Sequence, residues 1–355
     1  MIHKHINLLY LFFPVAFILG PLAAEVLVAY INLYFLFNFN KFKKKVIDLF
    51  NENKILIIII FIFFVTSIIS SINASEKFIA FYKSFFHLRF YIFFIFTIIF
   101  CKYYFYKNRN LENYKKIYLL IFLFLSLSVL IEFLVHYLYE INIIDYRFQF
   151  YQYSRYSGLF GHELIAGSFL QKGLIFLLLF SLKFQSKFNF FFGTYLLLII
   201  FLTGERIAFL YSLILYILVI SANIKKVDLK KLLLFFFLII SIVYFSFQNS
   251  IHLKERYLSI YNHSLSLINS DKRKNLDSPY FKLFSSGISV WKKNKLFGVG
   301  VRNYRIECKN YSEICSTHPH NYYLEILAEN GILGIVLFIL MLFFFNFCLK
   351  KNIFF

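Results

Sequence analysis

Residues 55–75 read ILIIIIFIFFVTSIISSINAS and contain no Asp, Glu, Lys or Arg. A helix of this length and composition can span the hydrocarbon core of a bilayer, which needs about 20 apolar residues. A soluble domain has too little interior to hide many such stretches. The segment therefore predicts a transmembrane helix.

Similar uncharged stretches recur along the whole chain. Of its 355 residues, 60% are hydrophobic and 16% are charged, whereas soluble domains carry about 25% charged residues. Gly20-Pro21 divides the first apolar stretch, because proline breaks a helix. We therefore expect an all-α polytopic membrane protein with about ten transmembrane helices. The expected spans are residues 6–20, 22–38, 55–75, 85–101, 117–138, 164–182, 188–204, 207–224, 232–248 and 330–349.

The positions of lysine and arginine predict how these spans are oriented. Of the 38 basic residues, 19 flank the spans on one side, and seven others lie outside the long loop 248–320. Because cytoplasmic loops carry the excess of positive charge, both termini are expected in the cytoplasm and the large loop outside. We thus expect nine spans in residues 1–247, the large outward loop in 248–320, and the last span with a short cytoplasmic tail in 321–355. The net charge of +20 then indicates no nucleic-acid partner.

Within the large loop, apolar residues recur at helical spacing. They are Tyr280, Phe281, Phe284, Ile288 and Trp291. This period predicts an amphipathic helix. Such a helix lies on the membrane surface or over the helix bundle. The alternative is a helix that only packs on its own loop.

Charged residues inside a bilayer are costly, so those in the predicted spans are candidates for function. Lys172 lies near the middle of a span, where it either pairs with Glu132 or lines a polar cavity. Arg206 follows the turn 203–205 between two short spans, at the expected outer face. Its forked guanidinium suits a phosphate at headgroup depth. A topological anchor and a local pair with Glu205 are the alternatives.

Two other outer segments carry groups suited to phosphate binding or proton transfer. Arg155 and His162 bracket a glycine-containing loop, and His318-Pro319-His320-Asn321 precedes the last span. Neutral histidine, with a pKa of about 6.5, accepts a proton near neutral pH. No third ligand stands at a standard zinc spacing, and the chain has no Asp-x-Asp, so we expect no metal site.

Two pairs of residues flank this histidine segment. Glu325 and Glu329 share one helix face, where they either accept hydrogen bonds from sugar hydroxyls or favour the helix start through its dipole. Cys308 and Cys315 lie seven residues apart in the outward loop. An oxidising compartment permits a disulfide there, and two free thiols are the alternative.

Five segments, taken in order, resemble the O-antigen ligase and O-antigen polymerase superfamily. They are residues 155–162, 203–208, 256–258, 295–301 and 318–334. The resemblance implies a type C glycosyltransferase architecture in the bacterial inner membrane, with the large loop in the periplasm. It also implies a donor glycan on undecaprenyl diphosphate, with no cofactor, metal or nucleotide.

The resemblance also assigns roles to residues. The histidine before asparagine, His320, matches the general base, and Arg206 matches a ligand of the diphosphate. Arg256 matches a further phosphate ligand at the start of the large loop. The remaining expected substrate-binding residues are Arg155, His318, Asn321 and Glu329. The chain departs from the family pattern at Glu205, where a small residue is usual, and at 162–163, where Pro-Asn is commoner.

The expected function is that of an O-antigen ligase, which transfers the glycan to a lipid A–core sugar. A polymerase that joins lipid-linked repeat units is the alternative within the superfamily. A lipid-glycan flippase or transporter is the alternative of another class. Transporters favour charged, discontinuous helices at the bilayer midplane, whereas most candidate groups here lie on one expected face, which favours an enzyme.

Overall fold

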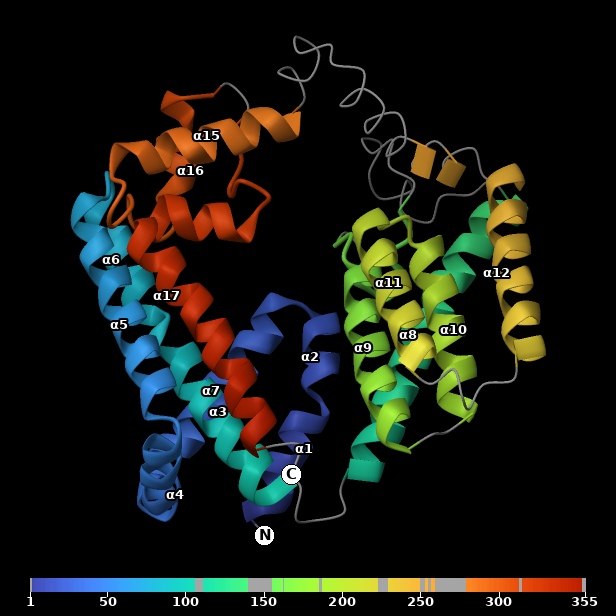
Figure 1. Ribbon diagram of the computed structural model, residues 1–355, viewed down its shortest axis with the longest axis horizontal. Coiled ribbons are helices and arrows are strands. Elements are labelled where there is room, and N and C mark those ends of the chain that lie inside the picture. The colour runs from blue at the N-terminus through green and yellow to red at the C-terminus, as the bar shows by residue number, and fades with distance from the viewer. Residues whose placement is uncertain are drawn as a thin grey trace. The chain divides into compact units, whose positions relative to one another are not determined.

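The computed structural model describes residues 2–105, 111–139, 155–161, 163–184, 187–222, 229–249, 253–254, 257–258, 279–312 and 315–352 (Figure 1). These residues form helices joined by turns, with no strand in the described ranges. The chain divides into two compact units, which are described separately. The first comprises residues 1–9, 25–111 and 269–355, and the second comprises residues 10–24 and 112–268.

Helices of the first unit come from both ends of the chain. They are α1 (Ile2–Leu11, in its first part), α3 (Pro21–Phe37), α4 (Phe39–Glu52), α5 (Lys54–Ser70), η1 (Ser71–Asn73), α6 (Lys77–Phe86), α7 (Leu88–Phe100), η2 (Cys101–Phe105), α15 (Pro279–Lys293), α16 (Tyr304–Glu307), η5 (Cys308–Asn310) and α17 (Tyr322–Asn352). α17 packs along α5, and α15 packs on α17. The expected helix at 280–291 is therefore present as α15.

The second unit is built from the middle of the chain. Its helices are α2 (Phe13–Leu19), α8 (Leu111–Tyr139), η3 (Gly158–Phe160), α9 (Ala166–Phe184), α10 (Lys187–Leu202), α11 (Arg206–Ala222) and α12 (Leu229–Asn249). α9 packs against α10 and α11 around fully buried Leu170, Leu174 and Leu196. Gly173 brings α9 close to α8, because a Cβ there would lie 2.5 Å from the ring of Phe122.

Each of the ten expected spans coincides with helical residues. Within the described residues, four stretches are long and apolar enough to cross a membrane: Lys54–Asn73, Lys77–Tyr103, Tyr114–His136 and Tyr322–Phe345. α3 and α4 make a fifth if they are taken as one span bent by 94°. The corresponding apolar parts of α9, α10, α11 and α12 are shorter. The protein is thus an all-α membrane protein, while ten spans, their orientation and the periplasmic place of the loop stay predictions.

A bidentate ion pair joins two helices of the first unit. The guanidinium of Arg89 in α7 donates to both carboxylate oxygens of Glu25 in α3, each at 2.9 Å. The side-chain amide of Asn32 donates to the backbone carbonyl of Arg89 at 2.7 Å. The Arg89–Glu25 bonds pair two charges on otherwise apolar helices, which explains how Glu25 is tolerated there.

Candidate active site

The last apolar helix is interrupted where a loop pairs with it. Gly331 has φ 68° and ψ −166°, so α17 is kinked there. The loop 295–300 supplies the missing bonds. Backbone N–H groups of Val299 and Gly300 donate to the carbonyls of Ala328 and Glu329 at 3.0 and 2.9 Å. In return, Ile332 N–H donates to the carbonyl of Lys295 at 2.9 Å.

Glycine makes this joint possible. A Cβ at Gly331 would lie 2.2 Å from the carbonyl oxygen of Leu296, and one at Gly298 would lie 2.4 Å from the carbonyl carbon of Glu329. Only glycine permits such a close approach of two backbones. The segments 295–301 and 328–334, which carry much of the sequence resemblance, are therefore two halves of one backbone joint. We call it the glycine joint.

Glu329 extends the glycine joint to the next turn. Its buried carboxylate accepts hydrogen bonds from the backbone N–H groups of Arg302 and Tyr304. Arg302 has a left-handed backbone with φ 65°, which is unusual for a residue with a Cβ. Glu329 thus holds the 302–304 turn against the start of α17, and its expected role in binding substrate stays a prediction.

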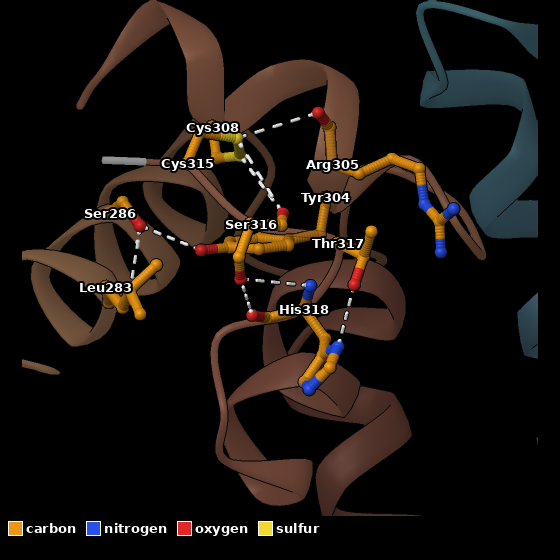
Figure 2. Close-up of a disulfide and its surroundings, with 9 residues drawn as sticks. All are labelled: Leu283, Ser286, Tyr304, Arg305, Cys308, Cys315, Ser316, Thr317 and His318. Carbon is orange, nitrogen blue, oxygen red and sulfur yellow. Dashed lines mark hydrogen bonds between the residues drawn. A yellow bond between two sulfur atoms is a disulfide. The ribbon is translucent and has the colours of Figure 1, made fainter. Parts of the chain in front are cut away.

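A disulfide lies at the base of the histidine segment. Cys308 and Cys315 are bonded, with their Cα atoms 5.7 Å apart (Figure 2). Beneath them, the hydroxyls of Tyr304 and Ser286 lie 2.8 Å apart and link α16 to α15. The disulfide closes residues 308–315 into a short loop, which leads into His318.

An ion pair between an exposed lysine and a buried carboxylate supports the same region. Lys293 Nζ lies 2.7 Å from the Glu307 carboxylate, which also accepts a hydrogen bond from Ser75. Burial acts to raise the pKa of Glu307, but the hydrogen bonds from Lys293 and Ser75 hold it below the usual value. Glu307 is therefore charged at neutral pH and ties α16 to α15.

The two histidines lie side by side at the end of this segment. Their ring centroids are 4.5 Å apart in an edge-to-face arrangement, and Thr317 Oγ1 lies 3.0 Å from Nδ1 of His318. His320 has φ 53°, a strained backbone of the kind that clusters at functional sites. Both side chains reach solvent. Desolvation, and then the charge of His318, lowers the pKa of His320 below its ordinary value.

Asn321 anchors this segment to α17. Its side-chain oxygen accepts a hydrogen bond from Leu324 N–H at 3.1 Å, and its carbonyl accepts one from Glu325 N–H at 2.9 Å. This is a helix N-cap, in which a side-chain oxygen satisfies a free N–H of the first turn. The cap fixes where α17 begins, and so fixes the backbone next to His320.

In the second unit, Arg206 is the first residue of α11. The preceding turn contains Gly204 with φ 71°. Glu205 points to a different helix, because its carboxylate accepts hydrogen bonds from the N–H groups of Gly167 and Ser168 at 2.7 and 3.0 Å. Glu205 therefore caps the N-terminus of α9. This contact gives a structural reason for an acidic residue at a position where the family usually has a small one.

Arg155 comes to the same turn. The N–H of Tyr156 donates to the carbonyl of Thr203 at 3.3 Å, which sets the backbone of 155–156 beside the 203–206 turn. Arg155 Nε is buried and has no hydrogen-bond partner among the described residues. An unsatisfied guanidinium nitrogen is costly unless a ligand reaches it. The two expected arginine-bearing segments are thus neighbours.

The glycine loop after Arg155 is held by another carboxylate. Glu132 accepts a hydrogen bond from Gly158 N–H at 2.7 Å. Lys172 is exposed on α9, and in the described part of the chain no ion pair joins it to Glu132. Of the two expectations for Lys172, the pair with Glu132 is therefore absent.

Arg256 and His162 lie outside the described residues. Tyr257 follows Arg256 in sequence and is described. Its hydroxyl donates to the carbonyl of Phe201 at 2.9 Å, and its ring stacks on that of Phe201 with centroids 4.8 Å apart. The start of the large loop is thus anchored two residues before Thr203.

Sequence reasoning missed two arginines beside the histidine segment. Arg302 has the left-handed backbone noted above, and Arg305 Nε is buried without a partner among the described residues. In Figure 2 the Arg305 side chain extends away from the disulfide. Their spacing of three residues, just before Cys308, is the signal that could have drawn attention to them. No group of three or more metal-ligating side chains occurs in the described ranges.

Residues 191–339 match the family model described as O-antigen ligase. The matched range contains the Arg206 turn, the glycine joint and the histidine segment. No curated protein and no solved structure matches the chain.

Proposed function

We propose, on the match of residues 191–339 to the O-antigen ligase family model, that this protein transfers a glycan from undecaprenyl diphosphate to a lipid A–core sugar. The family consists of glycosyltransferase-like membrane enzymes that use lipid-linked glycans and glycan acceptors. The proposal places the reaction at the periplasmic face of the inner membrane and uses neither metal nor nucleotide.

The observation that carries the proposal is the state of His320. Its backbone is strained, its ring reaches solvent, and its pKa is lowered. A histidine in this state is neutral at physiological pH and can accept a proton. The proposal assigns it the proton of the acceptor hydroxyl.

The arginines support a role in binding the donor. Arg206 stands at the positive end of α11, where a cation opposes the helix dipole at a cost of about 0.3–1 kcal/mol. A diphosphate would reverse that cost, because it attracts both the guanidinium and the helix terminus. Arg155, with its unsatisfied Nε beside the same turn, suits the same ligand. Arg256 is a further candidate.

The proposed step is a single displacement. The acceptor oxygen attacks the anomeric carbon, and the bond from that carbon to the diphosphate oxygen breaks. The hydroxyl proton passes to a ring nitrogen of His320, and undecaprenyl diphosphate leaves with the bonding electron pair. Arg206 and Arg155 stabilise the charge that develops on the diphosphate. Attack opposite to the leaving group inverts the anomeric carbon.

The test uses purified protein, undecaprenyl diphosphate glycan and lipid A–core, with no nucleotide or added metal. His320→Ala is expected to lower the transfer rate by about 10²–10⁴-fold, as loss of a general base does. The adjacent His318→Ala is the matched control and is expected to cost less. Arg206→Lys is also expected to lower the transfer rate, because an ammonium group cannot reproduce forked phosphate binding.

Other outcomes would change the conclusion. Transfer by His320→Ala at the wild-type rate would overturn the assignment of the base. Product formed only from two lipid-linked repeat units would make the protein a polymerase. If no product forms and the lipid-linked glycan moves from one leaflet of a vesicle membrane to the other, the protein would be a flippase or transporter.

A further inference from the structure

The helix α15 has one apolar face that is filled by its own unit. Leu283 and Val290 on this face are 5% and 0% exposed. On the same side, Ser286 bonds with Tyr304, and a Cβ at Gly287 would lie 2.7 Å from Leu324. This face is thus occupied by α16 and the start of α17.

A second apolar flank of α15 faces outward. Phe281, Phe284 and Ile288 are 45%, 39% and 41% exposed, and Trp291 is partly exposed at the end of the same row. Their spacing of three, four and three residues places them in one stripe along the helix. We call these four residues the outer stripe. Large apolar side chains gathered in this way mark a surface that contacts something other than water.

Charge around the outer stripe points to an anionic partner. The helix contains no acidic residue. Two exposed lysines, Lys292 in α15 and Lys295 just after it, lie at the Trp291 end of the stripe, and Trp291 Nε1 donates to the Lys295 carbonyl at 3.0 Å. Lysine near an apolar stripe is typical of helices that lie in the bilayer interface, where the ammonium groups meet lipid phosphates. A second copy of the same face would bring lysine against lysine, which is unfavourable.

The place of α15 in its unit fits the same partner. Figure 1 shows α15 over the short first part of α17, before the kink at Gly331, and across the direction of α5 and of the long second part of α17. Its buried face contacts Leu324, near the start of the stretch Tyr322–Phe345 that is long and apolar enough to span a bilayer. A helix that crosses the end of a span lies near the level of the headgroups.

We propose that α15 is an interfacial helix, which inserts the outer stripe into the headgroup boundary of an anionic bilayer. Its inner face holds Tyr304 and Leu324 at the same time. The helix would therefore couple the membrane surface to the segment that carries the two histidines. This proposal does not depend on the glycosyltransferase assignment.

Trp291 makes the proposal testable, because it is the only tryptophan in the chain. The purified full-length protein is placed in nanodiscs of phosphatidylglycerol and phosphatidylcholine, with or without brominated acyl chains. Bromine is expected to lower Trp291 emission at least about twofold, as insertion near the acyl boundary predicts. Aqueous iodide is expected to quench weakly. Discs of phosphatidylcholine alone should show less lipid quenching.

A double variant tests the outer stripe itself. Phe281→Ser with Phe284→Ser is expected to reduce lipid quenching and increase iodide quenching. Tyr311→Ser, which changes a 48% exposed aromatic residue outside α15, is the matched control and should leave both unchanged. Strong iodide quenching with no effect of bromine in the wild-type protein would overturn the proposal. Protection from both quenchers would also overturn it, and would indicate a protein partner on this face.

Discussion

Glu205 Oε1 accepts a hydrogen bond from the backbone nitrogen of Gly167 at 2.7 Å, and the residue after Glu205 is the expected diphosphate ligand. The same carboxylate accepts a bond from Ser168 N–H. A negative charge at the start of α9 satisfies free N–H groups and interacts favourably with the helix dipole. The turn before Arg206 is thus fixed by a helix distant in sequence.

Glu205→Ala is expected to lower the free energy of unfolding by about 1 kcal/mol, as loss of a helix cap does. Glu205→Gln should cost less, because the amide oxygen still accepts one hydrogen bond. Thermal unfolding of the detergent-solubilised protein measures the change. Glu163→Ala, at an exposed carboxylate just before α9, is the control. Equal stability of Glu205→Ala and wild type would contradict the capping role.

The positions of the helices were predictable from the sequence, because uncharged runs such as 55–75 have a direct physical meaning in a membrane. Which face of α15 is buried could not be predicted. The apolar residues at helical spacing include Phe281, Phe284 and Ile288, but these residues are exposed. Small Ser286 and Gly287 line the buried face instead, because they let Tyr304 and Leu324 approach. Hydrophobic period alone does not reveal that choice.

The candidate site was predictable only in part for a related reason. Segment 318–321 could be recognised as a place for a base, because histidine is the side chain whose ordinary pKa lies near neutral pH. The contacts that shape the site are backbone bonds between distant segments, such as those of Val299 and Gly300 to α17. Backbone groups are the same in every residue, so the sequence carries no sign of their partners.

The glycine joint predicts a large effect of a single methyl group. Gly331→Ala should destabilise the protein by at least about 1–3 kcal/mol, because its backbone region is nearly restricted to glycine. The clash with the Leu296 carbonyl, 2.2 Å away, adds to this cost. Gly20→Ala is the matched control, since Gly20 has a similar backbone with φ 119° and ψ 171° but meets nothing within 4 Å. Chemical unfolding in detergent compares them. A smaller loss for Gly331→Ala than for Gly20→Ala would contradict the joint.

The ion pair beneath the histidine segment predicts a difference between neighbouring lysines. Lys293→Met should destabilise the protein by about 1–3 kcal/mol, because it leaves the buried Glu307 carboxylate with no cationic partner and only neutral ones such as Ser75. Lys292→Met changes the neighbouring exposed lysine, which makes no ion pair with Glu307, and should have little effect. Since the pKa of Glu307 is lowered in the folded state, its stabilising effect is present above the unfolded pKa and is lost as pH falls through the folded one. Unfolding measured between neutral and acidic pH should show this loss in wild type and not in Glu307→Gln.

The disulfide predicts a pattern of thiol labelling. In a Cys101→Ser, Cys348→Ser background, Cys308 and Cys315 should react with a maleimide in denaturant only after reduction. Untreated protein that labels as strongly as reduced protein would show free thiols. Cys308→Ser with Cys315→Ser should loosen the segment before His318 and lower stability by about 2–3 kcal/mol, which is the value for closing so short a loop.

The lowered pKa of His320 predicts the pH dependence of transfer. A general base acts when it is deprotonated, so the rate should fall on the acidic side, with an apparent pKa below the usual value of about 6.5. Part of the lowering comes from the charge of His318, whose ring lies 4.5 Å from that of His320. Removing that charge should let His320 hold its proton to higher pH. His318→Ala is therefore expected to move the acidic limb upward, whereas His318→Lys keeps a positive charge and should leave the limb low. Single-turnover transfer rates across pH 4.5–8 measure the limb, and a limb that does not move in His318→Ala would show that His320 is not the group that titrates.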